Sequence, residues 1–384
     1  MSQQQHYDVA VVGLGALGSA AAFYAAHKGA KVIAFEQFEL GHVRGASHDT
    51  SRIVRTSYEA PQYVALAKSA YKDWADVEKA SGQQLLSITG GVVFLPKGGP
   101  LLARDFAQSL DANQVPYELL NSAQVAQRWP QFKIADTVDV VYTPDTGIAH
   151  ASRSVAAMTG LARNRGATIL EKTTVEYVKP KRYGGGGGVV VGTTKGAFHA
   201  DKVILATDAW TNKLLAPLNA SIPLSIMQEQ ITYFKPANPD TFEPAHFPVW
   251  IWHADPCFYG FPSYGEPTIK AGRDQANNYM TPEQRTFVHS PQLLQQLTSF
   301  MDGFIPDKDR QALRTVTCQY TITPDRQFII SPLVEHPDII LGLGAAHGFK
   351  FAPAIGRILA ELAIDGRTTD DISKFGIPPV NAKL

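Results

Sequence analysis

Cysteine and long apolar runs are scarce in this sequence, and both shortages bear on where the protein works. Only Cys257 and Cys318 occur among 384 residues, too few for the disulfide framework of a small secreted domain. No apolar run approaches the roughly 18 residues of a membrane-spanning helix, and residues 1–8 lack the basic and apolar regions of a signal peptide. We therefore expect a protein of a reducing compartment, without a membrane partner.

An excess of one charge is also missing. The 35 lysine and arginine residues equal the 35 aspartate and glutamate residues in number, and neither sign forms a tract. Nucleic-acid-binding surfaces need a basic excess, so nucleic acid is not an expected partner, and no metal site is expected. Apolar material is ample, at 45% of the residues, which predicts two domains or one elaborated domain for a chain of this length.

A glycine motif near the N-terminus lies between a strand and a helix. Residues 7–12 predict a short buried strand, and residues 19–27 predict an alanine-rich helix. Between them, Gly13 permits a tight turn, Gly15 lets a pyrophosphate approach backbone N–H groups, and Gly18 allows close packing of the helix. This arrangement predicts a dinucleotide site.

An acidic residue in register with the glycines restricts which dinucleotide can bind. Glu36 follows a second predicted strand, residues 31–35, and lies 18 residues beyond Gly18. Its carboxylate can accept hydrogen bonds from both hydroxyls of an adenosine ribose and would repel a 2′-phosphate. NADP is therefore disfavoured, whereas FAD and NAD share the fingerprint.

The order of the remaining patterns predicts a nucleotide-binding domain that the chain leaves twice. A β-rich stretch begins at residue 85, and a stretch rich in aromatic residues and proline runs from 222 to about 316. Helices are predicted at 63–80, 152–165 and 352–364. We expect a discontinuous nucleotide-binding domain of residues 1–84, 148–218 and 319–384, and a substrate domain of residues 85–147 and 219–318.

In two shorter segments, the spacing of apolar residues does not indicate a regular helix or strand. Residues 44–58 predict a loop that enters a helix, with His48, Arg52 and Arg55 on it. Five consecutive glycines, residues 184–188, predict a flexible hairpin tip without chemistry.

Five motifs, in order along the chain, resemble the monomeric sarcosine oxidase family, which includes N-methyltryptophan oxidase, peroxisomal sarcosine oxidase and L-pipecolate oxidase. They are Gly45-Ala-Ser-His48-Asp-Thr-Ser-Arg52-Ile-Val-Arg55, Phe258-Tyr-Gly-Phe-Pro-Ser263 with Ile269-Lys270-Ala-Gly272, Thr317-Cys318-Gln-Tyr320-Thr, Pro324-Asp325 with Phe328-Ile-Ile330, and Ala346-His-Gly-Phe-Lys350-Phe. The resemblance covers essentially the whole chain. It implies FAD as the cofactor and an α/β plus β fold, with a Rossmann-like FAD-binding domain of p-hydroxybenzoate-hydroxylase-like topology and a second, antiparallel-sheet substrate domain.

The resemblance also implies roles in redox chemistry. Cys318 matches the cysteine that bonds covalently to the flavin, although a buried free cysteine is the commoner fate of this residue type. Lys270 matches the residue that activates oxygen, and Arg52 and His48 match residues near the flavin ring. Fixed positive charge suits such a site because reduction leaves the flavin anionic.

A second group of residues is expected to hold the substrate. Arg55 and Lys350 match the pair that anchors its carboxylate, although Arg55 could instead pair with Glu59, four residues on, at a helix surface. Tyr259 and Tyr320 would line the pocket, and Tyr259 is also expected to act in catalysis. The full set expected to contact FAD is Gly13, Gly15, Gly18, Glu36, Ser47, His48, Arg52, Val175, Cys318, Gly348 and Lys350.

The chain departs from the family pattern at two positions. Where sarcosine oxidases have a histidine four residues after the lysine, this chain has Asp274, preceded by Arg273. This change argues against sarcosine itself as the preferred substrate. Asp208 occupies a position where the family usually has glycine, which predicts a local difference in a turn near the flavin.

These features predict an enzyme that oxidises a secondary α-amino acid, sarcosine or another N-methyl amino acid, to an imine while O2 becomes hydrogen peroxide. L-Pipecolate, L-proline and saccharopine stay open as substrates, as does an amino acid dehydrogenase of the same fold, and a non-catalytic nucleotide-binding regulator is a remote alternative. We expect a monomer. The final residues Ala382-Lys383-Leu384 resemble a peroxisomal address, which would make the import receptor a partner; otherwise the protein would be cytoplasmic.

Overall fold

The first of two large sheets is mixed, and its parallel centre consists of apolar segments. The computed structural model describes residues 6–181 and 187–379. In spatial order, the strands are β10 (Val175–Pro180), β11 (Val189–Thr193), β12 (Gly196–Leu205), β1 (His6–Val12), β2 (Val32–Phe35) and β9 (Thr168–Leu170), with β19 (Ile339–Leu343) on β12 and β18 (Ile329–Pro332) on β19. Because β1 pairs in parallel with β2 and β12, the glycine turn after β1 lies at the carboxyl end of these strands, where such sheets bind ligands.

Helices cover one face of this sheet, as the near-continuous apolar strands require. α1 (Ala16–His27) packs against α5 (Ala151–Asn164) and α8 (Ala352–Ile364), and α2 (Pro61–Ser81) packs against both as well. Val9 and Val11 of β1 belong to the core beneath these helices, whereas Ala10 and Val12 face a second core shared with β11 and α6 (Thr211–Leu215). The alternation follows from the period of two along a strand.

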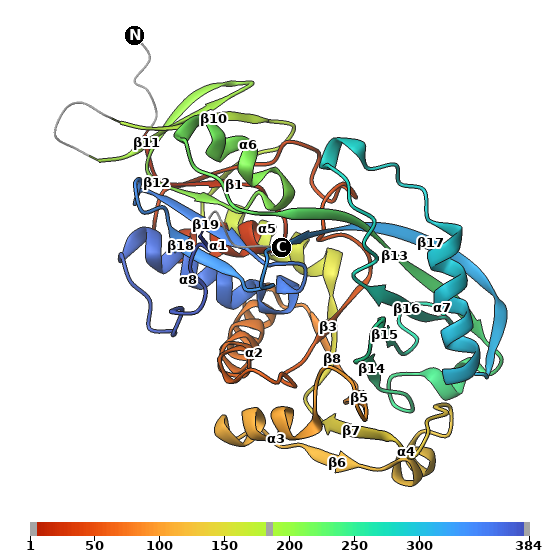
Figure 1. Cartoon of the computed structure of the whole chain (residues 1–384). Coiled ribbons are helices and arrows are strands. Elements are labelled where there is room, and N and C mark those ends of the chain that lie inside the picture. The colour runs from red at the N-terminus through yellow and green to blue at the C-terminus, as the bar shows by residue number, and fades with distance from the viewer. Residues whose placement is uncertain (1–5, 182–186, 380–384) are drawn as a thin grey trace.

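The second large sheet is antiparallel except where β14 pairs with β5. Its strands, in spatial order, are β17 (Lys308–Ile322), β13 (Ser225–Pro236), β16 (Ile269–Asp274), β15 (Cys257–Phe261), β14 (Val249–Trp252), β5 (Gly91–Pro96), β7 (Val138–Thr143) and β6 (Glu118–Leu120). The two longest, β13 and β17, run side by side through the middle of the molecule (Figure 1).

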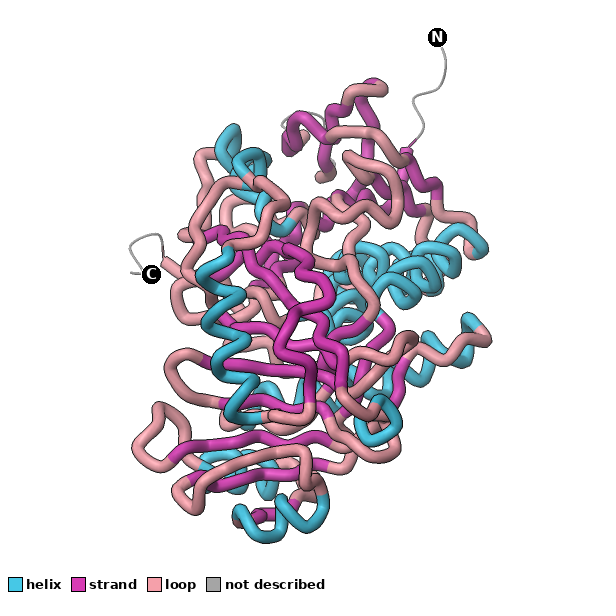
Figure 2. Tube along the Cα trace, turned by 90° about the vertical axis from the view of Figure 1, so that its right-hand side faces the viewer, coloured by secondary structure: helices cyan, strands magenta, loops and turns pink. Residues whose placement is uncertain are grey.

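Helix α7 (Pro291–Phe304) covers part of the second sheet, as Figure 2 shows. Its Phe300 stacks on Phe258 of β15 at a centroid distance of 4.1 Å, and Ser290 caps its first turn by accepting a hydrogen bond from Leu293 N at 3.4 Å. Aromatic residues between α7 and the sheet thus form a core separate from that of the first sheet.

Smaller elements complete the described part of the chain. A three-stranded sheet consists of β3 (Ser51–Val54), β8 (Gly147–His150) and β4 (Leu86–Ile88). The remaining helices are α3 (Ala103–Ala112), α4 (Ser122–Arg128) and the 3₁₀ turns η1 (Asp208–Trp210), η2 (Ala216–Leu218), η3 (Pro239–Phe242), η4 (Pro282–Gln284) and η5 (Gly348–Phe351).

Most predicted elements are confirmed, and one is wrong. The helix predicted at 352–364 has the bounds of α8, and those predicted at 63–80 and 152–165 match α2 and α5 within two residues. Residues 44–58 are not a continuous loop before α2, because the β-branched pair Ile53-Val54 lies in β3 and pairs with β8. The glycine run is only partly within the described residues; β10 and β11 on either side of it are antiparallel.

The predicted domain boundaries stay a proposal, although the sheets divide in a similar way. Strands of the first sheet come from residues 6–35, 168–205 and 329–343, and those of the second from 91–143 and 225–322. β17 continues four residues past the boundary predicted at 318.

Within the described ranges, no helix has the length and apolar character needed to cross a membrane. The same residues contain no group of three histidine, cysteine, aspartate or glutamate side chains placed to hold a metal ion.

Candidate active site

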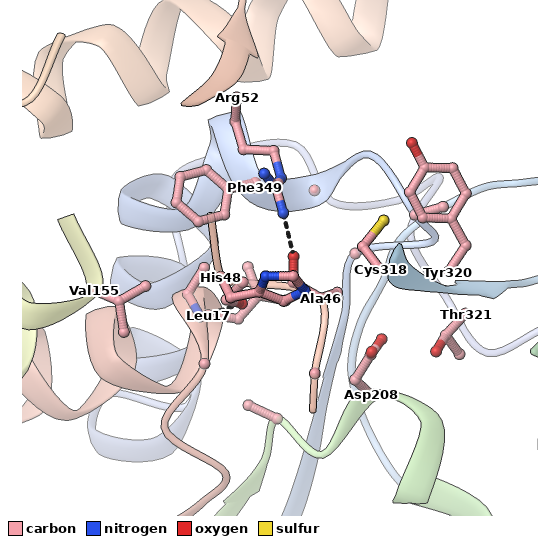
Figure 3. A pocket seen from close by; sticks show the side chains of 18 of the residues that line it. Leu17, Ala46, His48, Arg52, Val155, Asp208, Cys318, Tyr320, Thr321 and Phe349 are labelled. Carbon is pink, nitrogen blue, oxygen red and sulfur yellow. Dashed lines mark hydrogen bonds between the residues drawn. The ribbon is translucent and has the colours of Figure 1, made fainter. Parts of the chain in front are cut away.

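A cavity of about 680 Å³ joins the glycine turn of the first sheet to the inner face of the second. Its lining brings together side chains that are far apart in the sequence, and Figure 3 shows part of it from close by, with ten of the residues labelled. Every predicted site residue except Gly18 lines it: Gly13, Gly15, Glu36, Ser47, His48, Arg52, Arg55, Val175, Tyr259, Lys270, Cys318, Tyr320, Gly348 and Lys350.

The glycine turn leaves no room for side chains. Gly13 has a φ of 87°, and a Cβ there would lie 2.5 Å from Ala206 O. A Cβ at Gly18 would lie 1.8 Å from the carbonyl oxygen of Gly13, so Gly18 serves packing and not the cavity surface. At Gly15, a Cβ would approach Ser47 Oγ at 3.0 Å. The N-terminus of α1 is therefore open to the cavity, as a pyrophosphate site requires.

Glu36 lies at the end of β2 and is 5% exposed. Its Oε2 accepts a hydrogen bond from Leu14 N at 3.0 Å, and its Oε1 accepts one from Phe38 N at 3.1 Å. Burial alone would raise the pKa of Glu36, but His42 and the two backbone N–H groups hold it below its usual value. Glu36 is thus an anionic acceptor at the cavity wall.

His48 lies just before β3, and Arg52 lies within that strand. Burial and the charge of Arg52 lower the pKa of His48 to about 4, so its imidazole is neutral at pH 7. Among the described residues, His48 Nε2 is buried without a hydrogen-bond partner. Arg52 donates to Ala46 O at 2.8 Å, as Figure 3 shows, and its guanidinium lies 5.8 Å from the Phe349 ring centroid.

Lys270 of β16 is 4% exposed and makes an ion pair with Asp49. The distance from Lys270 Nζ to Asp49 Oδ2 is 2.5 Å, and Nζ also donates to Ser51 O and Ser51 Oγ, each at 3.0 Å. Burial lowers the pKa of Lys270 to about 8, while Asp49 opposes that shift. Sequence reasoning missed Asp49, because an aspartate within a motif gives no sign that it reaches a lysine 221 positions away.

Both cysteines line the cavity as free thiols. Cys318 of β17 is 8% exposed, and burial raises its pKa to about 11. Cys257, at the start of β15, has its pKa raised to about 12, again mainly by burial. No sequence motif assigned a role to Cys257, so its position in the cavity is a finding of the structure.

Arg55 and Lys350 lie in the same cavity, and each is 9% exposed. Arg55 places its guanidinium 3.9 Å from the Tyr58 ring centroid and donates to Ser57 O. Lys350 Nζ donates to His347 O at 2.9 Å. Burial, with Arg55 as the largest charged contributor, holds the pKa of Lys350 well below its usual value.

Arg52 lies in β3, and Arg55 follows the last residue of that strand. Both still face the cavity, since the strand ends there. Among the ion pairs of the described residues, none joins Arg55 to Glu59.

Two tyrosines line the same region of the cavity. Tyr259 is on β15 and Tyr320 on β17, and burial raises the pKa of both phenols above the usual tyrosine value. They therefore present uncharged aromatic walls.

The two departures from the family pattern have clear structural settings. Asp274, at the end of β16, accepts hydrogen bonds from Arg326 at 2.8 and 3.3 Å, so its charge is paired within the cavity wall. Arg326 directly follows the Pro324-Asp325 motif, but its position in the sequence did not identify Arg326 as a residue of the cavity. Asp208 has a φ of 47°, a left-handed conformation that glycine adopts without strain.

Comparison with known proteins agrees with this geometry. Residues 8–362 match the family model described as FAD dependent oxidoreductase. The chain belongs to this family. FAD dependence and the predicted fold class are thereby confirmed.

Several known proteins are similar to the chain along nearly its whole length. Monomeric sarcosine oxidase from a Bacillus species (strain B-0618) is 31% identical over 97% of this chain and 96% of that protein. Peroxisomal sarcosine oxidase from Homo sapiens is 29% identical over 98% and 97%, respectively. The structure of NikD, described as an unusual amino acid oxidase essential for nikkomycin biosynthesis, has a TM-score of 0.84 and 27% identity, with 97% of this chain and 98% of NikD covered.

The cavity of this FAD-dependent oxidoreductase has the donors and acceptors that FAD needs. The open N-terminus of α1 could hold the pyrophosphate, and Glu36 could accept from the ribose. His48 Nε2, buried and unpartnered among the described atoms, could bond to the flavin.

Proposed function

We propose that this protein oxidises a secondary α-amino acid, such as an N-methyl amino acid, to an imine and reduces O2 to hydrogen peroxide. One observation carries the proposal: a single cavity joins the dinucleotide-binding turn to a buried pocket with two basic side chains and two tyrosines. The relatives named sarcosine oxidase support this substrate class.

The proposed reaction balances without a further reactant. The substrate loses a hydride from carbon and a proton from nitrogen, and O2 gains two electrons and two protons to become hydrogen peroxide. Bound FAD would supply the two-electron exchange between amine and oxygen. Water then hydrolyses the imine without the enzyme.

Arg55 and Lys350 are proposed to bind the substrate carboxylate. Two buried basic groups side by side repel each other, and an entering carboxylate would relieve that repulsion and raise the pKa of Lys350. The same positive potential lowers the pKa of the substrate's amine, so the neutral amine is favoured in the pocket. Tyr259 and Tyr320 are proposed to exclude water, with Tyr259 close to the reacting amine.

Lys270 and Arg52 are proposed to provide positive charge where oxygen is reduced. A cation in a water-poor site stabilises the negative charge that develops on oxygen. Lys270 is the stronger candidate, because it is 4% exposed and borders the cavity.

The remaining proposals concern cofactor attachment and cellular context. Cys318 is proposed to link FAD covalently, and the contacts predicted at Ser47, Val175 and Gly348 are kept as proposals because all three line the cavity. The protein is proposed to act as a monomer. The proposed peroxisomal address at 382–384 lies outside the described residues and stays a prediction.

An anaerobic substrate panel tests the proposed function. The purified holoenzyme is mixed with sarcosine, other N-methyl amino acids, L-pipecolate, L-proline, saccharopine and, as controls, the matching primary amino acids, and flavin bleaching is recorded. We expect at least one secondary amino acid to bleach the flavin faster than its primary counterpart. Bleaching by primary amino acids alone would contradict the proposed substrate class.

Admitting air to the reduced enzyme tests the oxidase half of the proposal. We expect one hydrogen peroxide per imine formed. Turnover with an artificial electron acceptor but not with O2 would show an amino acid dehydrogenase instead.

A further inference from the structure

Asp49 holds an unfavourable backbone conformation beside the cavity. Its φ is 81°, a left-handed region where side chains other than glycine are strained. Its side chain is 13% exposed, and Oδ1 accepts a hydrogen bond from Tyr233 OH at 2.8 Å, while Oδ2 contacts Lys270 Nζ at 2.5 Å. Such strain persists only where surrounding contacts fix the residue, and here those contacts are made by the carboxylate.

The Lys270 ammonium is fixed by three acceptors. An ammonium has three N–H donors, and Asp49 Oδ2, Ser51 O and Ser51 Oγ lie within 3.0 Å of Nζ. All three acceptors come from one short segment, residues 49–51, that borders the cavity. The position of the charge on β16 therefore depends on this segment.

Within the described part of the chain, the other groups that affect the charge of Lys270 do not supply a compensating negative charge. Arg52 on β3 is cationic and lowers the pKa of Lys270, and His48 before it is neutral because its pKa is about 4. Tyr233 on β13 and Cys318 on β17 both have raised pKa values, caused first by burial, and are neutral at pH 7. The Phe261 ring of β15 lies 4.8 Å away and is apolar.

Asp49 is thus the anion that keeps Lys270 protonated. Its own pKa is lowered to about 2, because the charge of Lys270 outweighs the opposing effect of burial. Even with this partner, burial brings the pKa of Lys270 down to about 8. A buried lysine without a carboxylate partner loses its proton more readily still.

We propose that Asp49 is a positioning residue that fixes the Lys270 ammonium at the cavity and keeps it charged, so that the cation is present when oxygen is reduced. This inference rests on the role of Lys270 in the proposed function. It predicts that Asp49 acts through Lys270 and not by direct contact with the substrate.

A double-mutant cycle tests the inference with four holoenzymes: the wild type, D49N, K270M and D49N/K270M. Asparagine keeps the size of the side chain and an oxygen that can accept from Tyr233, but it removes the charge. After anaerobic reduction, each protein is mixed with O2 in a stopped-flow instrument between pH 6 and 9.5. We expect the pH at which D49N loses fast reoxidation to lie at least one unit below that of the wild type, which at pH 8 corresponds to a loss of at least about fivefold.

The variants separate a positioning role from a general structural one. In the K270M background, D49N should leave the slow reoxidation rate unchanged, since the cation on which Asp49 acts is already absent. D49E should restore part of the wild-type pH profile because it restores the charge. The inference is overturned if the pH profile of reoxidation of D49N equals that of the wild type. It is also overturned if D49N lowers the reoxidation rate by the same factor with and without Lys270.

Thermal unfolding of the same four proteins gives a readout that does not depend on turnover. The buried lysine has a folded-state pKa below its unfolded value, so its burial costs stability at low pH and the cost disappears as the pH rises. Without Asp49 this cost grows, and the Tm deficit of D49N should widen as the pH falls below about 8. The widening should vanish in the K270M background; a deficit that does not change with pH overturns the inference.

The two measurements distinguish failure of the inference from failure of the proposed function. If K270M reoxidises as fast as the wild type, Lys270 does not activate oxygen, and both the proposed role of Lys270 and the inference are overturned. If K270M is slow while D49N behaves as the wild type at every pH, the proposed function stands and the inference alone is overturned.

Discussion

Burial sets the charge states of the side chains around the cavity. It raises the pKa of Cys318 to about 11 and lowers that of His48 to about 4, so both are neutral at pH 7. It also holds the pKa of Lys350 well below the usual lysine value. A bound carboxylate favours the protonated form of Lys350. The affinity of this pocket for an anion therefore depends on how far the anion restores the proton of Lys350.

Removing either basic residue of the anchor should weaken substrate binding. Arg55→Ala and Lys350→Ala each remove a charge-assisted hydrogen bond worth about 1.5–3 kcal/mol, so we expect KM to rise roughly 10- to 150-fold, with a smaller effect on kcat. Steady-state kinetics with the best substrate of the anaerobic panel measures this. Arg104→Ala is the control, because that side chain is 74% exposed.

A substrate lacking the carboxylate sharpens this test. The wild type should oxidise the decarboxylated amine poorly, and the rate of this oxidation should fall little further when Arg55 or Lys350 is replaced. An equal loss for the amine and the amino acid would show that these residues do not bind the carboxylate.

Replacing Cys318 should release the flavin on denaturation. Acid precipitation of the wild type should leave the yellow chromophore in the pellet, whereas Cys318→Ala should leave it in the supernatant. Cys257→Ala is a matched control, because Cys257 is a second free thiol lining the same cavity. Soluble flavin from the wild type would exclude a covalent link.

At the scale of elements, the contact between α1 and α8 depends on small residues. Gly356 of α8 faces Ala20 of α1 so closely that an added Cβ would lie 2.3 Å from Ala20 Cβ and 2.6 Å from Ala20 C. Since the second distance is to backbone, the helices would have to separate. Both helices meet beneath the parallel strands, so their spacing affects the start of α1, where the glycine turn opens to the cavity.

Gly356→Ala should therefore destabilise the protein. Overpacking of a well-packed core costs about 1–3 kcal/mol, and we expect a lower Tm in thermal unfolding of the holoenzyme. The control is Gly303→Ala in α7, where an added Cβ meets nothing within 4 Å, and where alanine should stabilise the helix by about 0.5–1 kcal/mol. Equal Tm values for the two variants would show that the helices adjust freely.

The elements also show what local patterns reveal. The helix α8 could be predicted to the residue because its apolar spacing and its position after a glycine turn agree. β3 was missed because its four residues, Ser51–Val54, include a charged arginine and show no strand alternation; they form a strand only because β8 offers a partner. A pairing with residues almost 100 positions away is invisible to a local pattern.

At the scale of the whole molecule, the cavity lies between the two large sheets. Its walls come from the glycine turn and β10 on one side and from β15, β16 and β17 on the other. A ligand that fills it contacts both sheets at once. FAD binding should therefore stabilise the whole fold and not only the nucleotide-binding part.

Thermal unfolding of apoprotein prepared from the Cys318→Ala variant tests this prediction. Adding FAD should raise Tm in a concentration-dependent manner, with about 2.7 kcal/mol of stabilisation at 100 times Kd. FMN, which lacks the adenosine that Glu36 is proposed to bind, should raise Tm less. Equal shifts with FAD and FMN would contradict the proposed site for the adenosine half.

The glycine turn and its acidic partner Glu36 could be predicted from the sequence alone, because backbone clearance and residue order specify them locally. The roles expected of the other cavity residues, such as Lys270 and Cys318, followed from the resemblance of five motifs to a known family. The folded structure was needed to reveal the Lys270–Asp49 and Asp274–Arg326 pairs, the neutral state of His48, and the position of Cys257 in the cavity. Each of these depends on burial and on contacts between segments of chain that meet only in the fold, and no spacing along the sequence encodes such contacts.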